Sequence, residues 1–303
     1  MLRHMTVLRF YTLVVLAAGC AAKPPPSALP PVSPPPVVAP EPEATPPVPT
    51  KPTPGASEAS VAASLHVALG IPVDADPSDD TLLDRGELVI SYNHRLNAPN
   101  WVAWHLDAGD LGSTKRSNGF RTDAGLPSSF YPVRDADYSG SGFDRGHLCP
   151  SGDRTRSPEA NRATFLFTNV HPQRHEMNAG PWEKLETYER ELARSGKELF
   201  LVAGGLFAAE PERIGKNPEA ARRIAVPTAS YKIVVVLERG QRAADVTADT
   251  PVLAVSMPNR TDLANRPYQD FLVTIRELEK SSGYDFDTNV SRVVQDAIET
   301  RVP

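Results

Sequence analysis

Short apolar runs bounded by turn-forming residues dominate the chain after about residue 56, and they predict strands. Residues 88–92 and 101–106 are two such runs, and the stretch 93–100 between them contains Asn and Pro residues that favour a turn. Further strands are expected at 165–167, 199–203, 231–237 and 252–256.

Apolar positions with helical spacing occur in two other segments. One runs between Pro181 and Gly196, where a proline at the start and a glycine past the end are usual helix boundaries. The second is the amphipathic segment 268–281. Strands and helices mix without regular alternation, so we expect an α+β fold with a largely antiparallel central sheet flanked by helices.

The first 20 residues predict an export signal. Basic residues precede the apolar stretch 10–18, which is too short to span a bilayer because about 18 or more apolar residues are needed. Residues 16–20 resemble a bacterial lipobox with Cys20 as the lipidated residue, although Ala17 stands where leucine is usual. We therefore expect an exported protein, either a membrane-anchored lipoprotein of the cell envelope or a secreted protein.

Residues 21–60 predict a disordered, proline-rich tether. Fifteen of the 31 residues from 24 to 54 are proline, which prevents regular helices and sheet ladders. The tether is either a spacer that holds the folded part away from a membrane or a leader without a role. The remaining chain, 61–303, suits one domain with a sizeable core. If Cys20 is lipidated or removed, Cys149 has no partner for an internal disulfide.

Charge limits the type of surface that the protein presents. The formal net charge of −5 argues against a generally basic coat for nucleic acid. Between residues 115 and 174, however, nine Lys/Arg and six Asp/Glu give a local charge of 9 − 6 = +3. That local excess is enough to hold phosphates, but by itself it fits a solvated loop region equally well. The long irregular stretch 107–146 is typical of a functional loop.

The run Asp144-Arg145-Gly146-His147, with Asn178 and Glu186 downstream, carries the chemistry for cutting a phosphodiester. A guanidinium binds phosphate bidentately, although Arg145 could equally form an ion pair with Asp144. An imidazole removes a proton from water near neutral pH. Amide and carboxylate oxygens suit Mg²⁺.

This set resembles the DNA/RNA non-specific endonucleases, the ββα-metal (His-Me finger) nucleases. The resemblance also includes residues 168–173 (TNVHPQ) and Trp182, and it extends over roughly residues 88–286. It implies a ββα-metal fold and a Mg²⁺-dependent endonuclease without sugar specificity. Such an enzyme hydrolyses DNA and RNA to 5′-phosphate ends.

The resemblance also implies a role for each site residue. His147 is the general base, Asn178 is the direct ligand of a hydrated Mg²⁺ for which Mn²⁺ can substitute, and Glu186 holds a water of that ion. The remaining site residues are Arg116, Arg145 and Arg190, which contact phosphate, and Asn169, which organises the surroundings of His147. An unperturbed histidine pKa of about 6.5 predicts that activity falls below about pH 6.

Other interpretations of the same residues stay open. Asn178 could be a helix-terminal cap, and Glu186 with Arg190 a surface ion pair four residues apart. The residues of a hypothetical zinc site are His147, Cys149, His171 and His175, although Pro172 weakens its geometry. Cys149 could instead pair with His147 as a thiolate or be a small buried thiol.

At the level of the whole protein, one alternative is a catalytically inactive surface lipoprotein that uses a nuclease scaffold to bind nucleic acid or a protein partner. Expected partners of an active enzyme are DNA and RNA, the membrane through the lipid anchor, and an inhibitor protein. The sequence does not indicate an oligomeric state.

Overall fold

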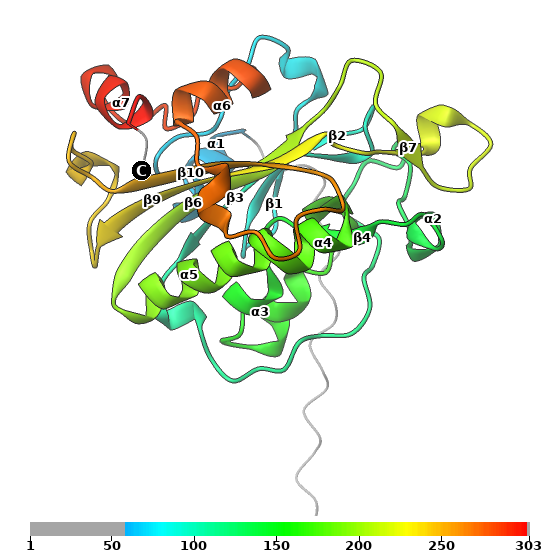
Figure 1. Cartoon of the computed structure of the whole chain (residues 1–303), viewed down its shortest axis with the longest axis horizontal. Helices are drawn as coiled ribbons and strands as arrows, with labels where there is room; N and C mark the ends of the chain where they lie inside the picture. Colours follow the sequence, from blue (N-terminus) through cyan, green and yellow to red (C-terminus); the bar gives the residue numbers. More distant parts are fainter. Residues whose placement is uncertain (1–57, 302–303) are drawn as a thin grey trace, which may run out of the picture. The chain divides into compact units, whose positions relative to one another are not determined.

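The computed structural model describes residues 58–301, and this part of the chain is built around one central sheet (Figure 1). The expected export signal with Cys20, and the tether up to residue 57, lie outside the described residues. Residues 58–60, the last of the expected tether, are the first residues of helix α1 (Glu58–Ala62). Among residues 58–301 no helix is both long enough and apolar enough to cross a membrane.

The central sheet has six strands in the order β1-β2-β3-β6-β9-β10, and every neighbouring pair is antiparallel. Its strands are β1 (Thr81–Asp84), β2 (Val89–Asn93), β3 (Ala98–Leu106), β6 (Lys197–Leu206), β9 (Ala229–Glu238) and β10 (Val252–Pro258). The expected antiparallel sheet and all of its predicted strands except the one at 165–167 are confirmed. Asn97 (φ 52°) reverses the chain between β2 and β3, because asparagine tolerates the left-handed region.

The strand predicted at 165–167 is wrong. Leu166 forms only an isolated bridge with Arg121, and a 3₁₀ turn (Phe167–Asn169) follows at once. The apolar run exists because its side chains pack: the ring of Phe120 lies 5.1 Å from that of Phe165 and 5.7 Å from that of Phe167. Burial of aromatic side chains, not sheet pairing, therefore explains this segment.

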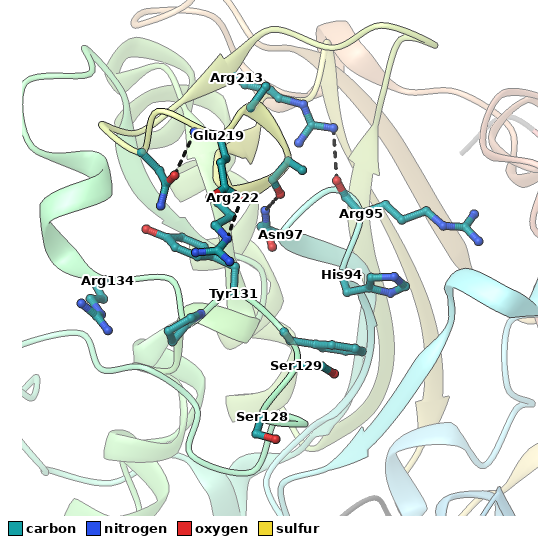
Figure 2. A pocket seen from close by; sticks show the side chains of 15 residues that line it. His94, Arg95, Asn97, Ser128, Ser129, Tyr131, Arg134, Arg213, Glu219 and Arg222 are labelled. Carbon is teal, nitrogen blue, oxygen red and sulfur yellow. Dashed lines mark hydrogen bonds and ion pairs between the residues drawn. The ribbon is translucent and has the colours of Figure 1, made fainter.

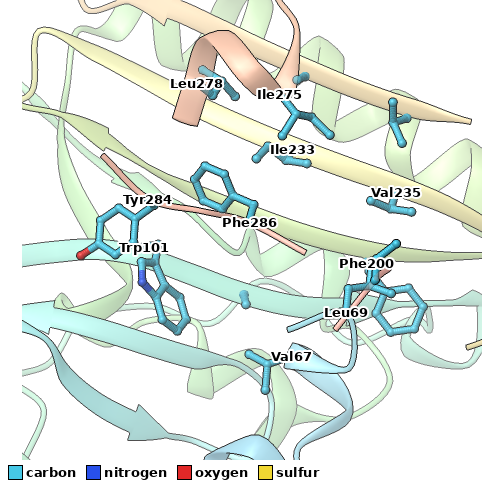
Figure 3. Packing of buried hydrophobic residues seen from close by; sticks show 14 of the residues in the cluster. Val67, Leu69, Trp101, Phe200, Ile233, Val235, Ile275, Leu278, Tyr284 and Phe286 are labelled. Carbon is cyan, nitrogen blue, oxygen red and sulfur yellow. The ribbon is translucent and has the colours of Figure 1, made fainter. Parts of the chain in front are cut away.

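Helices cover both faces of the sheet (Figure 1). On one face lie α3 (Pro158–Ala163), α4 (His175–Met177) and α5 (Glu183–Arg194); on the other lie α1, α6 (Ile275–Ser282) and α7 (Arg292–Glu299). The side chains of β3 alternate between two cores: Val102 and Trp104 pack in the core that includes α5, whereas Trp101 and Ala103 pack in the core that includes α6. Figure 3 shows Trp101 in this second core with Ile275 and Leu278.

The two predicted helices differ in outcome. The helix between Pro181 and Gly196 is confirmed as α5, which ends before Gly196 (φ 96°). The single helix predicted over 268–281 is wrong, because a 3₁₀ turn (Tyr268–Phe271) precedes α6 and Leu272 bridges Val255 of β10. Thr274 starts α6 anew, because its hydroxyl accepts from the Glu277 amide at 3.1 Å and its own amide donates to the Glu277 carboxylate at 2.8 Å.

Short elements form the edge of the fold beside the sheet. The region 107–146 is largely irregular, as expected, but it contains α2 (Asp135–Tyr138) and ends in a strand. That strand, β4 (Asp144–His147), pairs antiparallel with β5 (Val170–Gln173), and neither was predicted. A further pair, β7 (Arg213–Ile214) and β8 (Ile224–Ala225), lies nearby.

Replacing Asp287 with asparagine is expected to stabilise the protein more at pH 8 than at pH 4.5. Burial, with the Glu299 charge next, raises the pKa of Asp287 to about 7, and its Oδ2 atom has no hydrogen-bond partner. The native carboxyl therefore holds its proton more tightly than the unfolded one, so stability is lost as pH rises from about 4 towards 7. We expect a gain on the order of 1–3 kcal/mol at pH 8, measured by thermal unfolding. Asparagine tolerates the left-handed backbone here (φ 54°), and an equal gain at both pH values would contradict the explanation.

Candidate active site

The β4–β5 pair positions His147, the last residue of β4. Gly146 lies opposite His171, and His147 lies opposite Val170. A side chain at Gly146 would collide with Gln173, so this strand needs glycine for the close approach of its partner. The close pairing of β4 with β5 therefore fixes the position of the His147 imidazole at the end of β4.

The imidazole of His147 is packed between aromatic rings. Its ring centroid lies 5.0 Å from that of Phe120 and 4.9 Å from that of Phe165. Within residues 58–301 neither ring nitrogen makes a hydrogen bond, and Nε2 is buried. Burial, and next the positive charge of Arg116, lower the pKa of His147 to about 3. In the free protein this low pKa keeps the imidazole neutral, whereas the fall of activity below about pH 6 stays a prediction for the enzyme with its substrate bound.

Asn178 stands at the start of a kinked π-type turn (Asn178–Trp182) that joins α4 to α5. Its Nδ2 donates to Asp144 Oδ2 at 2.9 Å, and His175 Nδ1 lies 2.9 Å from the same oxygen. The side chain therefore does not cap a helix. Because its nitrogen is committed to Asp144, the amide oxygen is the atom left to bind a cation.

One cavity of about 380 Å³ brings the candidate residues together. Its lining residues are Arg116, Arg145, His147, Pro150, Ser151, Gly152, Asn178, Ala179, Glu183, Glu186 and Arg190. Asn178, Glu186 and Arg190 thus line the same space, as expected from the four-residue series 178, 182, 186 and 190. Trp182, in the same series, is fully buried and packs in the core instead.

Glu186 and Arg190 form the α5 wall of the cavity. Burial raises the pKa of Glu186 to about 7. Arg190 Nη1 lies 3.2 Å from Asp153 Oδ1 and 3.8 Å from Glu186 Oε2. The ion pair between Glu186 and Arg190 therefore exists, but it lines the cavity instead of the outer surface, and the buried Asp153 fixes the guanidinium.

Two other arginines, Arg116 and Arg145, also line the cavity. Arg145 Nε lies 2.8 Å from Asp135 Oδ1 at the start of α2, so its partner is not the neighbouring Asp144. Arg116 donates to the Ser151 hydroxyl at 2.5 Å, and its guanidinium lies 5.0 Å from the ring centre of Phe165. Both guanidinium groups border the space in front of His147.

Asn169 does not line the cavity but braces the loop that follows His147. Its fully buried amide donates to the carbonyl oxygens of Cys149 and Thr164, both at 2.8 Å, and accepts from the Cys149 amide at 3.0 Å. Asn169 thus holds the backbone at Cys149, two residues after His147, in position.

A buried charged network beneath the α5 wall was missed in the sequence. Lys232 Nζ lies 3.1 Å from Glu189 Oε2 and 4.5 Å from the ring centre of Trp182. Both charged side chains are essentially excluded from solvent. The signal that could have revealed the network is a lysine inside the apolar run 231–237, because a buried lysine needs a partner.

The hypothetical zinc site is not formed, because its four residues lie in different environments. His171 is buried and lies 2.9 Å from the Ser230 hydroxyl, whereas His175 is exposed beside Asp144. Cys149 is a buried thiol whose pKa is raised by burial, so a thiolate pair is not favoured either. In the described part of the chain, the acidic and histidine groups spaced to hold a metal are elsewhere and contain none of these four residues.

Comparisons with known proteins agree with this geometry. A family model described as DNA/RNA non-specific endonuclease matches residues 68–293. A protein named nuclease from Nostoc sp. is 41% identical over 254 residues, which are 82% of this chain and 90% of that protein. A mitochondrial nuclease EXOG from Danio rerio is 35% identical, over 65% of this chain and only 58% of its own length. A solved complex of EndoG with EndoGI contains a chain that matches with a TM-score of 0.63 and 26% identity, over 75% of this chain and 91% of that one.

Proposed function

Because the chain belongs to the DNA/RNA non-specific endonuclease family, we propose that it is a Mg²⁺-dependent endonuclease that hydrolyses both DNA and RNA. The observation that carries the proposal is the single cavity shared by His147, Asn178, Glu186 and the arginines. An imidazole, hard oxygen donors and guanidinium groups around one space are the requirements of phosphodiester hydrolysis.

His147 is the proposed general base. Its imidazole is neutral over the physiological pH range, so it can accept a proton from a water molecule. A phosphate that enters the cavity brings negative charge, which raises the pKa of His147 and makes it a stronger base at the time of reaction. The rings of Phe120 and Phe165 fix the orientation of the imidazole.

Two oxygen donors fit a hydrated divalent cation. Asn178 would hold it directly through its amide oxygen, and Glu186 would hold it through a water, because both side chains line the cavity. When bound, Mg²⁺, or Mn²⁺ in its place, supplies positive charge that neutralises a phosphate oxygen and the leaving oxygen.

Arg116 and Arg145 are placed to bind the phosphate of the substrate, since both line the wall beside His147. Arg190 adds positive charge while Asp153 holds it in place. With water as the nucleophile and departure of the 3′ oxygen, the products carry 5′-phosphates. No 2′-hydroxyl takes part, so RNA and DNA are both substrates.

Removal of divalent cations is expected to abolish nicking of supercoiled plasmid and degradation of RNA by the purified protein. Excess EDTA should stop both reactions, and added Mg²⁺ or Mn²⁺ should restore them. The product ends should accept a kinase label only after phosphatase treatment, as 5′-phosphates require. Full activity in EDTA would refute the metal requirement. If the intact protein binds DNA but does not cut it with Mg²⁺, the inactive surface lipoprotein is the correct alternative.

We further propose that the protein is exported and is either anchored at the cell envelope through lipidated Cys20 or secreted. The support is the sequence of residues 1–20 alone. An inhibitor protein is a proposed partner, and the support is the structural likeness of this chain to a chain of the EndoG/EndoGI complex, in which EndoG is inhibited.

A further inference from the structure

A second cavity in the described part of the chain, of about 910 Å³, is separate from the one that contains His147. It lies between the β2–β3 turn, the segment 128–134 and the segment 213–222 (Figure 2). The two cavities have no lining residue in common. The proposed chemistry therefore leaves this second cavity without a role.

Arginines dominate the charge of the second cavity. Its charged lining residues are Arg95, Arg134, Arg213, Arg222 and Glu219, a formal balance of +3. Figure 2 shows Arg134 and Arg95 on opposite sides, with Arg222 and Tyr131 between them. A concentration of positive charge in a chain of net charge −5 is a local feature that favours an anionic ligand.

Most of these guanidinium groups retain donors for a ligand. Within residues 58–301 the exposed side chain of Arg134 has no ion-pair partner. Arg213 donates to two carbonyl oxygens, those of Arg95 at 3.1 Å and Arg223 at 3.0 Å, so its positive charge is not neutralised by a carboxylate. Arg222 and Arg95 each pair only with an exposed carboxylate, and such pairs are weak.

Aromatic rings lie beside the arginines. Phe130 stacks on His94 with ring centroids 4.7 Å apart and planes inclined by 21°. Tyr131 adds a second ring to the lining, and its hydroxyl donates to Asp137 at 2.9 Å. Guanidinium groups beside aromatic faces are typical of sites for single-stranded nucleic acid, where phosphates meet arginine and bases stack on rings.

Helix α2 connects the two cavities. Arg134, which lines the second cavity, immediately precedes Asp135, and Asp135 holds Arg145 of the first cavity at 2.8 Å. Arg145 also lies 5.7 Å from the ring centre of Tyr138, at the other end of α2. Arg134 of the second cavity therefore directly precedes the residue that holds Arg145 of the first cavity.

We propose that the second cavity binds a single-stranded segment of the nucleic-acid substrate that flanks the scissile phosphate. This inference rests on the proposed nuclease function, because it assigns the bound strand as part of the substrate. Binding of the strand can be measured whether or not the protein is active. It predicts that substrate length matters: a strand long enough to reach both cavities binds more tightly than a short one.

The test compares two double variants with equal loss of charge. Arg134→Ala/Arg222→Ala removes positive charge from the second cavity, and Arg239→Ala/Arg292→Ala removes it from exposed positions that line neither cavity. For a 30-nucleotide single strand we expect the first variant to raise KM about 5–10-fold at unchanged kcat, and the control to change it less than about 2-fold. For a tetranucleotide both should behave like the wild type. Equal effects of the two variants, or an equal effect on both substrates, would overturn the proposal.

Binding without turnover separates the two hypotheses. The anisotropy of a labelled 30-nucleotide strand, measured in EDTA, should show the same about 5–10-fold weakening for Arg134→Ala/Arg222→Ala even if the wild type proves inactive. Phe130→Leu should weaken binding of the single strand more than that of a duplex of the same length, because only unpaired bases stack on a ring. Unchanged binding by both variants would reject the second cavity as a site, and equal losses for strand and duplex would reject the assignment to single strands.

Discussion

His147→Ala is expected to lower kcat/KM on plasmid DNA and on RNA about 10²–10⁴-fold, the usual contribution of a positioned general base. The expectation follows from the position of the imidazole at the end of β4, in the cavity that also contains Asn178 and Glu186. The loss should appear in kcat, with affinity for substrate nearly unchanged. Single-turnover assays with Mg²⁺ measure it directly.

The control for this variant is His175→Ala. His175 also carries an imidazole near the cavity, but its side chain is 73% exposed and contacts Asp144, not the reacting centre. We expect its rate to fall less than tenfold. A His147→Ala enzyme that is folded, as judged by its melting temperature, and still within tenfold of the wild type would exclude His147 as the base.

Lys232→Met is expected to destabilise the protein by about 3–5 kcal/mol, because it leaves the carboxylate of Glu189 buried without its partner. Lys232 and Glu189 are both essentially excluded from solvent, so water cannot replace the lost charge. Urea unfolding followed by fluorescence gives the free energy of unfolding.

Two further variants make this prediction specific. Lys197→Met breaks a more exposed lysine–glutamate pair, between β6 and β9, and should cost less than about 1 kcal/mol. Lys232→Met/Glu189→Leu removes both buried charges and should recover most of the loss. If Lys232→Met costs no more than Lys197→Met, the buried pair does not stabilise the fold as argued.

The strands of the sheet could be predicted wherever the sequence of a strand is itself a strongly apolar run. The runs at 199–203 and 231–237 are apolar enough to be strands in almost any context, and they pair as β6 and β9. Asp144–His147 is polar and contains glycine, so it shows no strand pattern of its own. It is a strand because Val170–Gln173 pairs with it, and such pairing depends on residues distant in the sequence.

The residues of the site could be predicted from the sequence, but the pKa values and contacts of their side chains could not. The motif and its spacing identified His147, Asn178 and Glu186, and the structure brings all three to one cavity. The low pKa of His147 depends on packing by Phe120 and Phe165, which belong to other segments. The choice of Asp135 over Asp144 as the partner of Arg145 depends likewise on where α2 lies. The local spacing of residues therefore predicts neither the low pKa of His147 nor the ion-pair partner of Arg145.

The turn at Asn178–Trp182 has an implication for descent. The Glu183 amide donates to the carbonyl of Asn178 five residues back, one residue more than an ordinary helical turn holds. Loss of a single codon here, for example that of Ala179, would shift Asn178 by one residue relative to α5, which corresponds to about 100° of helical winding. Such a descendant would keep its architecture and lose its chemistry in one mutational event, without any change in the recognisable DRGH signature.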